Sequence, residues 1–459
     1  MKELTLKQIA DWCGGTVAPE YETVPVTGVE SDSRKVEVGD LFVALRGERV
    51  DGHDFIPSAK TLGASAALVS RPSEELPCVV VESPLRAYGE IAKHYREMTG
   101  VKVVGITGSV GKTTTKEMIA SVLSRDFKLY KSEGNHNNEI GLPMTVMNMP
   151  EDTELLVAEL GTNHPGEIAY LSAIAQPDYA VITNIGIAHI EYLGSREGIL
   201  REKLDILRSS LKNTVGIFNG DEPLLWNVRD KGTHKKYYFG IDNPSCDVVA
   251  SGIQELDDGM RFHVSGFHHE FELFVPALGR HMVYNALAAA TVGLAMGVKP
   301  ETIQNELSIF RNTGMRQKIY EKNGMTIIED CYNAGPESTE AALGSIACLF
   351  ARTPQSIDDP FFSQLARNVE VAAFKNGYHV QCSLTEVDIK RPSMLQNLMN
   401  QQIRGVVVLG RCDKEMLHYL KQRFRYVSYA GLNPVDAKYD QTICDGRLIS
   451  KKAVEYDAT

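Results

Sequence analysis

The chain has 459 residues, of which 43% are hydrophobic and 23% charged, and its formal net charge is −11 at pH 7. These values are typical of a globular protein of about three domains and exclude a disordered or fibrous chain. The negative charge argues against nucleic acid as a partner. Eight scattered cysteines show no zinc-like spacing, which favours reduced thiols. The N-terminus lacks an apolar signal core, and no apolar run approaches the roughly 18 residues of a membrane-spanning helix, so we expect a cytoplasmic protein without membrane insertion.

Residues 1–85 are expected to form a small α/β domain. It opens with a helical pattern of apolar residues that ends at Gly14, and short strand-like runs separated by turns follow. Its loops place Ser31 and Arg34 beside apolar residues. Loops of this kind often form binding surfaces, although a solvated loop explains the same residues.

Residues 86–313 are expected to form a central domain in which strands alternate with helices. Near-continuous apolar runs at residues 101–106, 155–160 and 179–183 are typical of buried parallel strands. They predict a doubly wound α/β sheet that binds ligands at the carboxyl ends of its strands. Residues 246–276 alternate in polarity, which predicts antiparallel strands at the sheet edge.

A glycine-rich turn follows the strand predicted at residues 101–106. Glycines let backbone N–H groups close around phosphate oxygens, while Lys112 supplies a cation and the Thr113 hydroxyl can bind Mg²⁺. Ile106 stands where the general pattern has glycine, but the helical pattern after the loop argues against a chance glycine turn. The sequence therefore predicts a P-loop ATPase site, formed by Thr107, Gly108, Ser109, Gly111, Lys112, Thr113 and Thr114.

Three further residues are candidate ligands near this loop. Glu159 ends an apolar strand, where its carboxylate can coordinate Mg²⁺, although a capping or surface glutamate also fits the position. His189 follows the next strand, and a lone histidine is more often a structural or surface group than a ligand. Lys203 lies on a predicted helix; it becomes a metal ligand only as a carbamate, and a solvated lysine is the commoner case.

Several short motifs occur together in this chain. Besides His189 and Lys203, they comprise residues 32–34, 39–42, 51–53, 107–114, 135–143, 159–161, 166–167, 183–184, 279–281, 285–288 and 330–333. In combination they resemble the Mur ligases, a family of ATP-dependent amide-forming enzymes of peptidoglycan precursor synthesis. The resemblance covers residues 1 to about 344 and is strongest to the members that join D-alanyl-D-alanine to UDP-N-acetylmuramoyl-tripeptide.

The resemblance implies roles for individual residues. Thr113 and Glu159 would bind one Mg²⁺, while His189 and a carbamylated Lys203 would hold a second, and Lys112 would complete the catalytic set. The remaining assignments are Asn285 for adenine; Arg316 and Asp330 for the ribose or phosphate region; Ser31 and Arg34 for the uridine nucleotide; and Asn135, Asn137 and Asn138 for the sugar-peptide portion.

The reaction implied by the resemblance is the activation of a carboxylate by ATP. The substrate carboxylate attacks the γ-phosphate to give an acyl phosphate, and the incoming amine then displaces phosphate. Two metal ions and Lys112 would neutralise the charge that accumulates among the reacting oxygens. We expect the protein to act as a monomer.

Residues 314–459 are expected to form a C-terminal, Rossmann-like α/β layer. The third domain of a Mur ligase is not recognisable in the sequence. From about residue 345 the chain resembles part of a LacI-type effector-binding domain, with strands at 378–384 and 406–409 and a helix at 361–375. A fused, truncated or misjoined gene would explain this change.

Other functions stay open at this point. A non-catalytic fusion protein would bind nucleotide in the same loop and carry the regulator-like half-domain for another purpose. ATP hydrolysis that depends on both substrates would distinguish the ligase from it. A folate polyglutamate synthase fits the phosphate loop but not residues 51–53 or 135–143. Sugar-responsive DNA binding is disfavoured because the chain is acidic and offers no recognition helix.

Overall fold

The computed structural model describes four long stretches of the chain and a set of shorter segments after them. The chain divides into two compact units, Met1–Glu329 and Asp330–Thr459. The described residues are 1–47, 50–208, 213–256, 258–311, 318–322, 325–329, 346–351, 380–385, 405–410, 418, 420, 422, 426–431 and 440–443.

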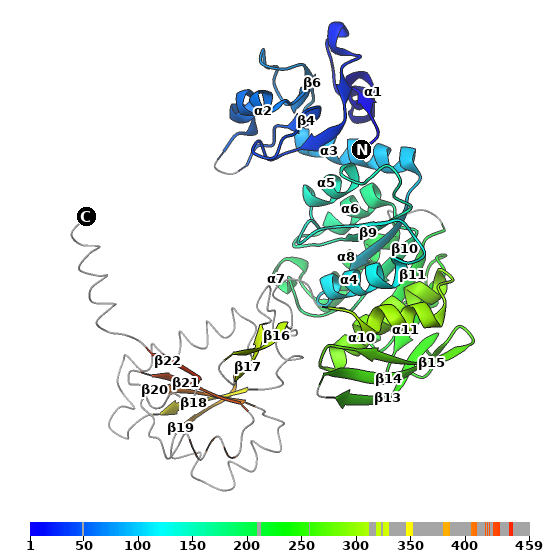
Figure 1. The fold of residues 1–459 in the computed structure, drawn as a ribbon, viewed down its shortest axis with the longest axis vertical. Coiled ribbons are helices and arrows are strands. Elements are labelled where there is room, and N and C mark those ends of the chain that lie inside the picture. The colour runs from blue at the N-terminus through cyan, green and yellow to red at the C-terminus, as the bar shows by residue number, and fades with distance from the viewer. Residues whose placement is uncertain are drawn as a thin grey trace, which may run out of the picture. The chain divides into compact units, whose positions relative to one another are not determined.

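A parallel sheet of four strands lies at the start of the first unit (Figure 1), in keeping with the predicted small α/β arrangement. Helix α1 (Leu6–Cys13) begins at a capping box, in which the side chains of Thr5 and Gln8 accept each other's backbone N–H groups. The helix ends at Gly14, as predicted, because this glycine takes a left-handed φ of 65°. The other elements are β1 (Leu4–Thr5), η1 (Pro19–Tyr21), β2 (Pro25–Val26), β3 (Gly28–Glu30), β4 (Asp40–Val43), η2 (Gly52–Phe55), α2 (Ile56–Leu62), β5 (Ala66–Val69) and β6 (Cys78–Val80).

A nine-stranded sheet forms the centre of the first unit, in the order β15-β14-β13-β12-β11-β10-β7-β9-β8. Neighbouring strands from β8 across to β13 run parallel, whereas β13, β14 and β15 are antiparallel. The predicted parallel sheet with an antiparallel edge is therefore confirmed. Its strands are β7 (Lys102–Thr107), β8 (Leu129–Lys131), β9 (Leu155–Glu159), β10 (Tyr179–Ile182), β11 (Val215–Asn219), β12 (Lys236–Gly240), β13 (Val248–Leu256), β14 (Gly259–Gly266) and β15 (His269–Val275).

Helices cover both faces of this sheet (Figure 1). Along β9, Leu155 and Val157 point into a core shared with α4, α10 and α11, while Leu156 and Ala158 point into a core shared with α3, α5, α6 and α8. This alternation follows from the two-residue period of a strand that is buried on both faces. The helices are α3 (Pro84–Thr99), α4 (Lys112–Leu123), α5 (Gly141–Met147), α6 (Glu167–Ala175), α7 (Ile190–Leu193), α8 (Arg196–Arg208), α9 (Pro223–Trp226), α10 (Arg280–Ala295) and α11 (Pro300–Ser308).

One hydrophobic core connects the four-stranded sheet with the central sheet. Helix α3 contributes Tyr88, Ile91 and Tyr95, which are fully buried in the same cluster as Val79 of β6 and Leu156 of β9. Burial of two tyrosines and an isoleucine supplies several kcal/mol, since each large apolar side chain contributes roughly 1.5–3 kcal/mol. The first unit is thus held together by side-chain packing across both sheets.

The second unit contains a fully parallel sheet of five strands, in the order β19-β18-β20-β21-β22. The strands predicted at 378–384 and 406–409 are confirmed by β19, from residue 380 on, and by β20, whereas residues 378–379 and the helix predicted at 361–375 lie outside the described residues. An antiparallel pair, β16 and β17, ends the first unit. These strands are β16 (Lys318–Lys322), β17 (Met325–Glu329), β18 (Ile346–Ala351), β19 (Val380–Thr385), β20 (Gly405–Gly410), β21 (Tyr426–Gly431) and β22 (Asp440–Ile443).

The described residues were also compared with the length needed for a membrane span and with the expected state of the cysteines. No helix among them is long and apolar enough to cross a bilayer. Cys13, Cys78 and Cys246 are free thiols. Burial raises the pKa of Cys13 to about 11 and that of Cys246 to about 12, so both thiols stay protonated at neutral pH.

Arg96→Ala is expected to destabilise the first unit. The Arg96 guanidinium is buried; it donates to the backbone oxygens of Ala175 and Gln176 and pairs with Asp178 at 3.2 Å. Its removal takes a donor from both backbone oxygens and the positive partner from Asp178, which keeps the backbone N–H of Val103, so we expect the free energy of unfolding to fall by roughly 2–4 kcal/mol. Thermal unfolding checks this against Lys93→Ala, which removes a partly exposed pair on the same helix. Equal unfolding midpoints for the two variants would contradict the prediction.

Candidate functional site

The phosphate loop joins the end of β7 to the start of α4 at the carboxyl edge of the central sheet. Gly111 precedes the helix with a left-handed φ of 82°, and a Cβ there would lie 2.7 Å from the side-chain oxygen of Asn285. A Cβ at Gly108 would lie 1.9 Å from the Thr183 hydroxyl. Both positions therefore need glycine, and the loop leads directly into the N-terminus of α4.

Residues that follow β10 brace this loop from the neighbouring strand. The side-chain oxygen of Asn184 accepts hydrogen bonds from the backbone N–H groups of Ser109 and Val110, both at 3.0 Å. The Thr183 hydroxyl donates to the Val110 carbonyl at 2.6 Å, and the Ser109 hydroxyl accepts from Gly186 N at 2.9 Å. The sequence motif contained this Thr-Asn pair, but its role as a brace becomes visible only when β10 lies beside β7.

Lys112 lies across the mouth of the loop. Its Nζ donates to the carbonyls of Gly108 at 2.9 Å and Ser109 at 3.4 Å. The hydroxyl of Thr107, at the base of the loop, is buried and has no hydrogen-bond partner among the described residues. The loop thus offers a cation, a buried hydroxyl and the N-terminus of α4, which together suit a phosphate group.

Thr113, in the first turn of α4, contacts Glu159, the last residue of β9. Glu159 ends β9 and is 3% exposed. Its Oε2 accepts the Thr113 hydroxyl at 2.7 Å, and its Oε1 accepts the side-chain amide of Asn137 at 2.9 Å. A hydroxyl and a carboxylate oxygen are ligands that Mg²⁺ prefers, with phosphate oxygens and water completing its shell. The two residues therefore fit a magnesium ion bound to a nucleotide.

His189 interacts electrostatically with Lys203 and with Lys112 of the phosphate loop. His189 precedes α7 in a left-handed conformation, with φ of 63°, and Lys203 on α8 is 2% exposed. Burial lowers the pKa of His189, and the positive charges of Lys112 and Lys203 lower it further. His189 is therefore neutral at neutral pH, which is the form that binds a metal ion. The structure thus brings the predicted residues together, while their individual roles stay predictions.

Glu202 is a residue that the sequence did not single out. It is 5% exposed, and its carboxylate accepts the backbone N–H groups of Gly166 at 2.7 Å and Ile168 at 2.8 Å. A weaker contact of 3.4 Å comes from the Thr162 hydroxyl. Glu202 thereby fixes α8, which carries Lys203, to the start of α6. Its position next to Lys203 was the one feature of the sequence that pointed to Glu202. Its hydrogen-bond partners could not be predicted, because they lie 34 or more residues away in the sequence.

Asn285 lies against the phosphate loop on α10. It is buried, and its side-chain oxygen accepts the hydroxyl of Thr115 at 3.2 Å and lies beside Gly111. Its contact with adenine stays a prediction. The other two residues assigned to the nucleotide, Arg316 and Asp330, lie outside the described residues.

The asparagines assigned to the sugar-peptide portion lie between β8 and α5. The side-chain oxygen of Asn138 accepts from Gly141 N at 2.9 Å, just before α5, and both Asn135 and Asn138 are exposed. The amide of Asn137 is engaged with Glu159. Asn137 and Asn138 therefore have contacts within the chain, and the part that the three asparagines play towards a substrate stays a prediction.

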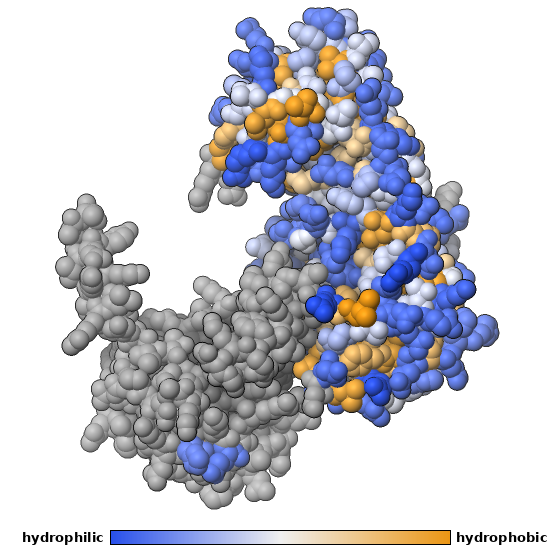
Figure 2. All heavy atoms as spheres, in the orientation of Figure 1, coloured by the Kyte–Doolittle hydropathy of each residue, from blue (hydrophilic) through white to orange (hydrophobic). Residues whose placement is uncertain are grey.

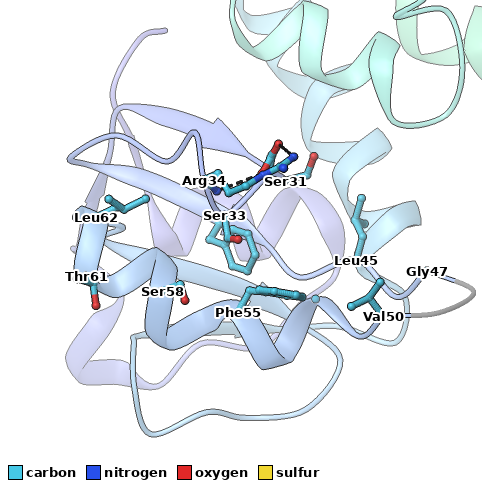
Figure 3. A pocket seen from close by; sticks show the side chains of 13 residues that line it. Ser31, Ser33, Arg34, Leu45, Gly47, Val50, Phe55, Ser58, Thr61 and Leu62 are labelled. Carbon is cyan, nitrogen blue, oxygen red and sulfur yellow. Dashed lines mark hydrogen bonds and ion pairs between the residues drawn. The ribbon is translucent and has the colours of Figure 1, made fainter. Parts of the chain in front are cut away.

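A pocket of about 930 Å³ opens in the N-terminal part of the chain, and Ser31 and Arg34 line it (Figure 3). Arg34 donates to both carboxylate oxygens of Asp32, at 2.8 and 2.7 Å, and these hydrogen bonds lower the pKa of Asp32 to about 2. Val50 and Phe55 also line the pocket and are exposed, and Figure 2 shows apolar side chains gathered on this part of the surface. The pocket thus combines polar groups with an apolar wall.

A hydrogen-bond network supports the loop beside this pocket. Asp51 accepts from the backbone N–H of His53 at 3.0 Å and pairs with its ring Nδ1 at 2.6 Å and with Arg71 at 3.0 Å. These contacts hold the pKa of Asp51 well below its usual range. The other ring nitrogen of His53 accepts from Ser70 N at 3.0 Å, which fixes Nδ1 as the protonated nitrogen of the neutral ring. The motif at residues 51–53 therefore shapes one wall of the pocket.

Comparison with known proteins assigns most of the chain to one family. Residues 25–108 match the Mur ligase family, catalytic domain, and residues 106–293 match the Mur ligase middle domain. The UDP-N-acetylmuramoyl-tripeptide--D-alanyl-D-alanine ligase of Bacillus subtilis (strain 168) is 43% identical over 349 residues, which is 75% of each chain. The ligase of the same name from Escherichia coli (strain K12) is 35% identical over 350 residues, 76% of this chain and 77% of its own.

Solved structures extend the match over the whole length. A crystal structure of MurF from Acinetobacter baumannii aligns with a TM-score of 0.73 and 27% identity, covering 100% of this chain and 99% of that one. MurF ligase from Thermotoga maritima in complex with ADP aligns with a TM-score of 0.67 and 26% identity over 88% of both chains. The protein therefore belongs to the Mur ligase family, and it is an ATP-dependent amide ligase.

Asn184→Ala is expected to weaken nucleotide binding by about tenfold. The loop loses two hydrogen bonds to its backbone, each worth about 0.5–1.5 kcal/mol, so it spends less time in the shape that receives phosphate. The dissociation constant of a non-hydrolysable ATP analogue measures the effect. Asn227→Ala, which changes an exposed asparagine after α9, is the control. Equal affinities in the two variants would show that Asn184 is not needed to hold the loop.

Proposed function

We propose that this protein joins D-alanyl-D-alanine to UDP-N-acetylmuramoyl-tripeptide at the expense of ATP, through an acyl-phosphate intermediate. One observation carries the proposal. The Thr113 hydroxyl at the end of the glycine loop meets the buried carboxylate of Glu159, in a chain whose curated relatives bear the name of this reaction.

The phosphate site supports the first step. The N-terminus of α4, its preceding glycine loop and Lys112 would bind the phosphates of ATP. Thr113 and Glu159 would hold one Mg²⁺, and His189 with a carbamylated Lys203 would hold a second. Bound Mg²⁺ would neutralise phosphate charge, so that two anions can approach each other.

The reaction would proceed in two steps, phosphoryl transfer and amide formation. An oxygen of the tripeptide carboxylate attacks the γ-phosphorus of ATP, the bond to the β-phosphate oxygen breaks, and ADP leaves. The nitrogen of D-alanyl-D-alanine then attacks the acyl carbon, loses a proton and expels phosphate. Lys112 would stay on the transferred phosphoryl group throughout, because its positive charge stabilises the oxygens on which negative charge develops.

The pocket in the N-terminal part supports a site for the uridine nucleotide. Its volume of about 930 Å³ lies within the range of small-molecule sites, which is roughly 300–1,000 Å³. Ser31 and Arg34 supply polar groups, and the apolar wall suits the flat face of a nucleobase.

Lys112→Ala is expected to lower phosphate release from ATP by at least about a hundredfold when both other substrates are present, because a cation is lost from the reacting phosphate. A coupled phosphate assay measures this, with each substrate omitted in turn. Lys102→Ala, which changes an exposed lysine at the start of β7, should keep the activity of the unmodified protein.

The same assay separates the ligase from the alternative. A non-catalytic nucleotide-binding fusion predicts no phosphate release that depends on both UDP-N-acetylmuramoyl-tripeptide and D-alanyl-D-alanine. Near-normal turnover by Lys112→Ala would remove the catalytic assignment of the phosphate loop.

A further inference from the structure

The two oxygens of the Glu159 carboxylate have different partners. Oε2 accepts the hydroxyl of Thr113 at 2.7 Å, and Oε1 accepts the side-chain amide of Asn137 at 2.9 Å. The Thr113 hydroxyl is the group that would bind Mg²⁺ at the end of the loop, so Oε2 is the oxygen that faces the proposed metal position. Oε1 is occupied by a residue that approaches from the segment between β8 and α5.

Asn137 is fixed by backbone contacts on both of its sides. Its carbonyl accepts from Gly161 N at 2.7 Å, and its own N–H donates to the Asn135 carbonyl at 2.7 Å. A Cβ at Gly161 would lie 2.9 Å from the side-chain carbon and oxygen of Asn137, so the glycine leaves room for this amide. The Glu159 backbone is also held, because its N–H donates to the Ser132 hydroxyl at 3.1 Å.

The direction of this amide follows from its partner. A carboxylate oxygen can only accept, so the NH₂ group of Asn137, rather than its oxygen, faces Oε1. A metal ion bound by both oxygens of Glu159 would compete with the Asn137 amide for Oε1, whereas a metal ion bound to Oε2 alone would leave this hydrogen bond in place. Glu159 would therefore act as a one-oxygen ligand rather than as a bidentate one.

This restriction distinguishes between the two common divalent cations. Mg²⁺ requires a near-octahedral shell of six oxygens and takes one oxygen from each carboxylate, whereas Ca²⁺ accepts six to eight ligands and often takes both oxygens. We infer that Asn137 is a positioning residue that makes Glu159 a one-oxygen ligand and thereby favours Mg²⁺ over Ca²⁺ at the nucleotide. The inference rests on the proposed magnesium site of Thr113 and Glu159.

The test compares the affinity of the full-length protein for a fluorescent, non-hydrolysable ATP analogue under three conditions: saturating Mg²⁺, saturating Ca²⁺, and EDTA. The ratio of the Ca²⁺ to the Mg²⁺ dissociation constant reports the metal preference without any turnover. The variants are Asn137→Ala, which frees Oε1, and Asn137→Leu, which keeps the approximate size and shape of the side chain but removes the donor. Asn148→Ala, an exposed asparagine after α5, is the matched control.

We expect the unmodified protein and Asn148→Ala to bind the Mg²⁺ complex more tightly than the Ca²⁺ complex. In both Asn137 variants the preference should fall by roughly tenfold, the size typical for residues that orient a metal ligand. Affinity in EDTA should not change, because the phosphate loop itself is intact. A general loss of structure would instead weaken binding in all three conditions.

Three results would overturn the inference. If both Asn137 variants keep the metal preference of the unmodified protein, Asn137 does not orient Glu159, although the proposed ligase function stands. If they lose affinity equally in EDTA and with either metal, Asn137 supports the loop as a whole rather than the carboxylate. If the unmodified protein binds no analogue under any condition, the proposed function fails and the inference fails with it.

Discussion

The parallel pairing of β7 with β9 and β10 is the constraint on which the site depends. Its register sets Ile106 opposite Glu159 and Thr107 opposite Ile182, so the loop begins where both neighbouring strands end. A slip of one residue would turn the Glu159 side chain to the other face of the sheet. The hydrogen bond between Thr113 and Glu159 is therefore a direct product of strand register.

The charges around His189 come from separate elements of the first unit. Burial and the positive charges of Lys112 and Lys203 lower its pKa, whereas the carboxylates of Glu167 and Glu191 act in the opposite direction. Carbamylation of Lys203, as proposed, would replace a buried cation by an anionic group, so the same position would then attract a metal ion instead of repelling it. His189, which is neutral at neutral pH, would add a nitrogen ligand without adding positive charge.

The sequence predicted the parts of the site that depend on local patterns. The strand at residues 101–106, the glycine turn and the helix after it form one continuous segment, so their spacing alone was informative. The contacts of Asn184 and Glu202 could not be predicted in this way, because their partners lie 34 or more residues away and meet them only through sheet order. The C-terminal strand β20 was found because its apolar run at residues 406–409 is typical of a buried parallel strand, whereas the β19 segment shows the apolar and polar alternation of a strand.

Helix α8, which carries Lys203, is held in place by the residue next to Lys203. Glu202 and Lys203 are consecutive on α8, and consecutive residues on a helix point about 100° apart. Glu202 therefore accepts hydrogen bonds from backbone N–H groups at the start of α6, whereas the positive charge of Lys203 lowers the pKa of His189. Since Glu202 accepts two backbone N–H groups in a buried place, any shift of α8 would leave those donors unpaired at a cost of about 1–3 kcal/mol each. That cost fixes α8, and with it the buried Lys203, relative to the start of α6.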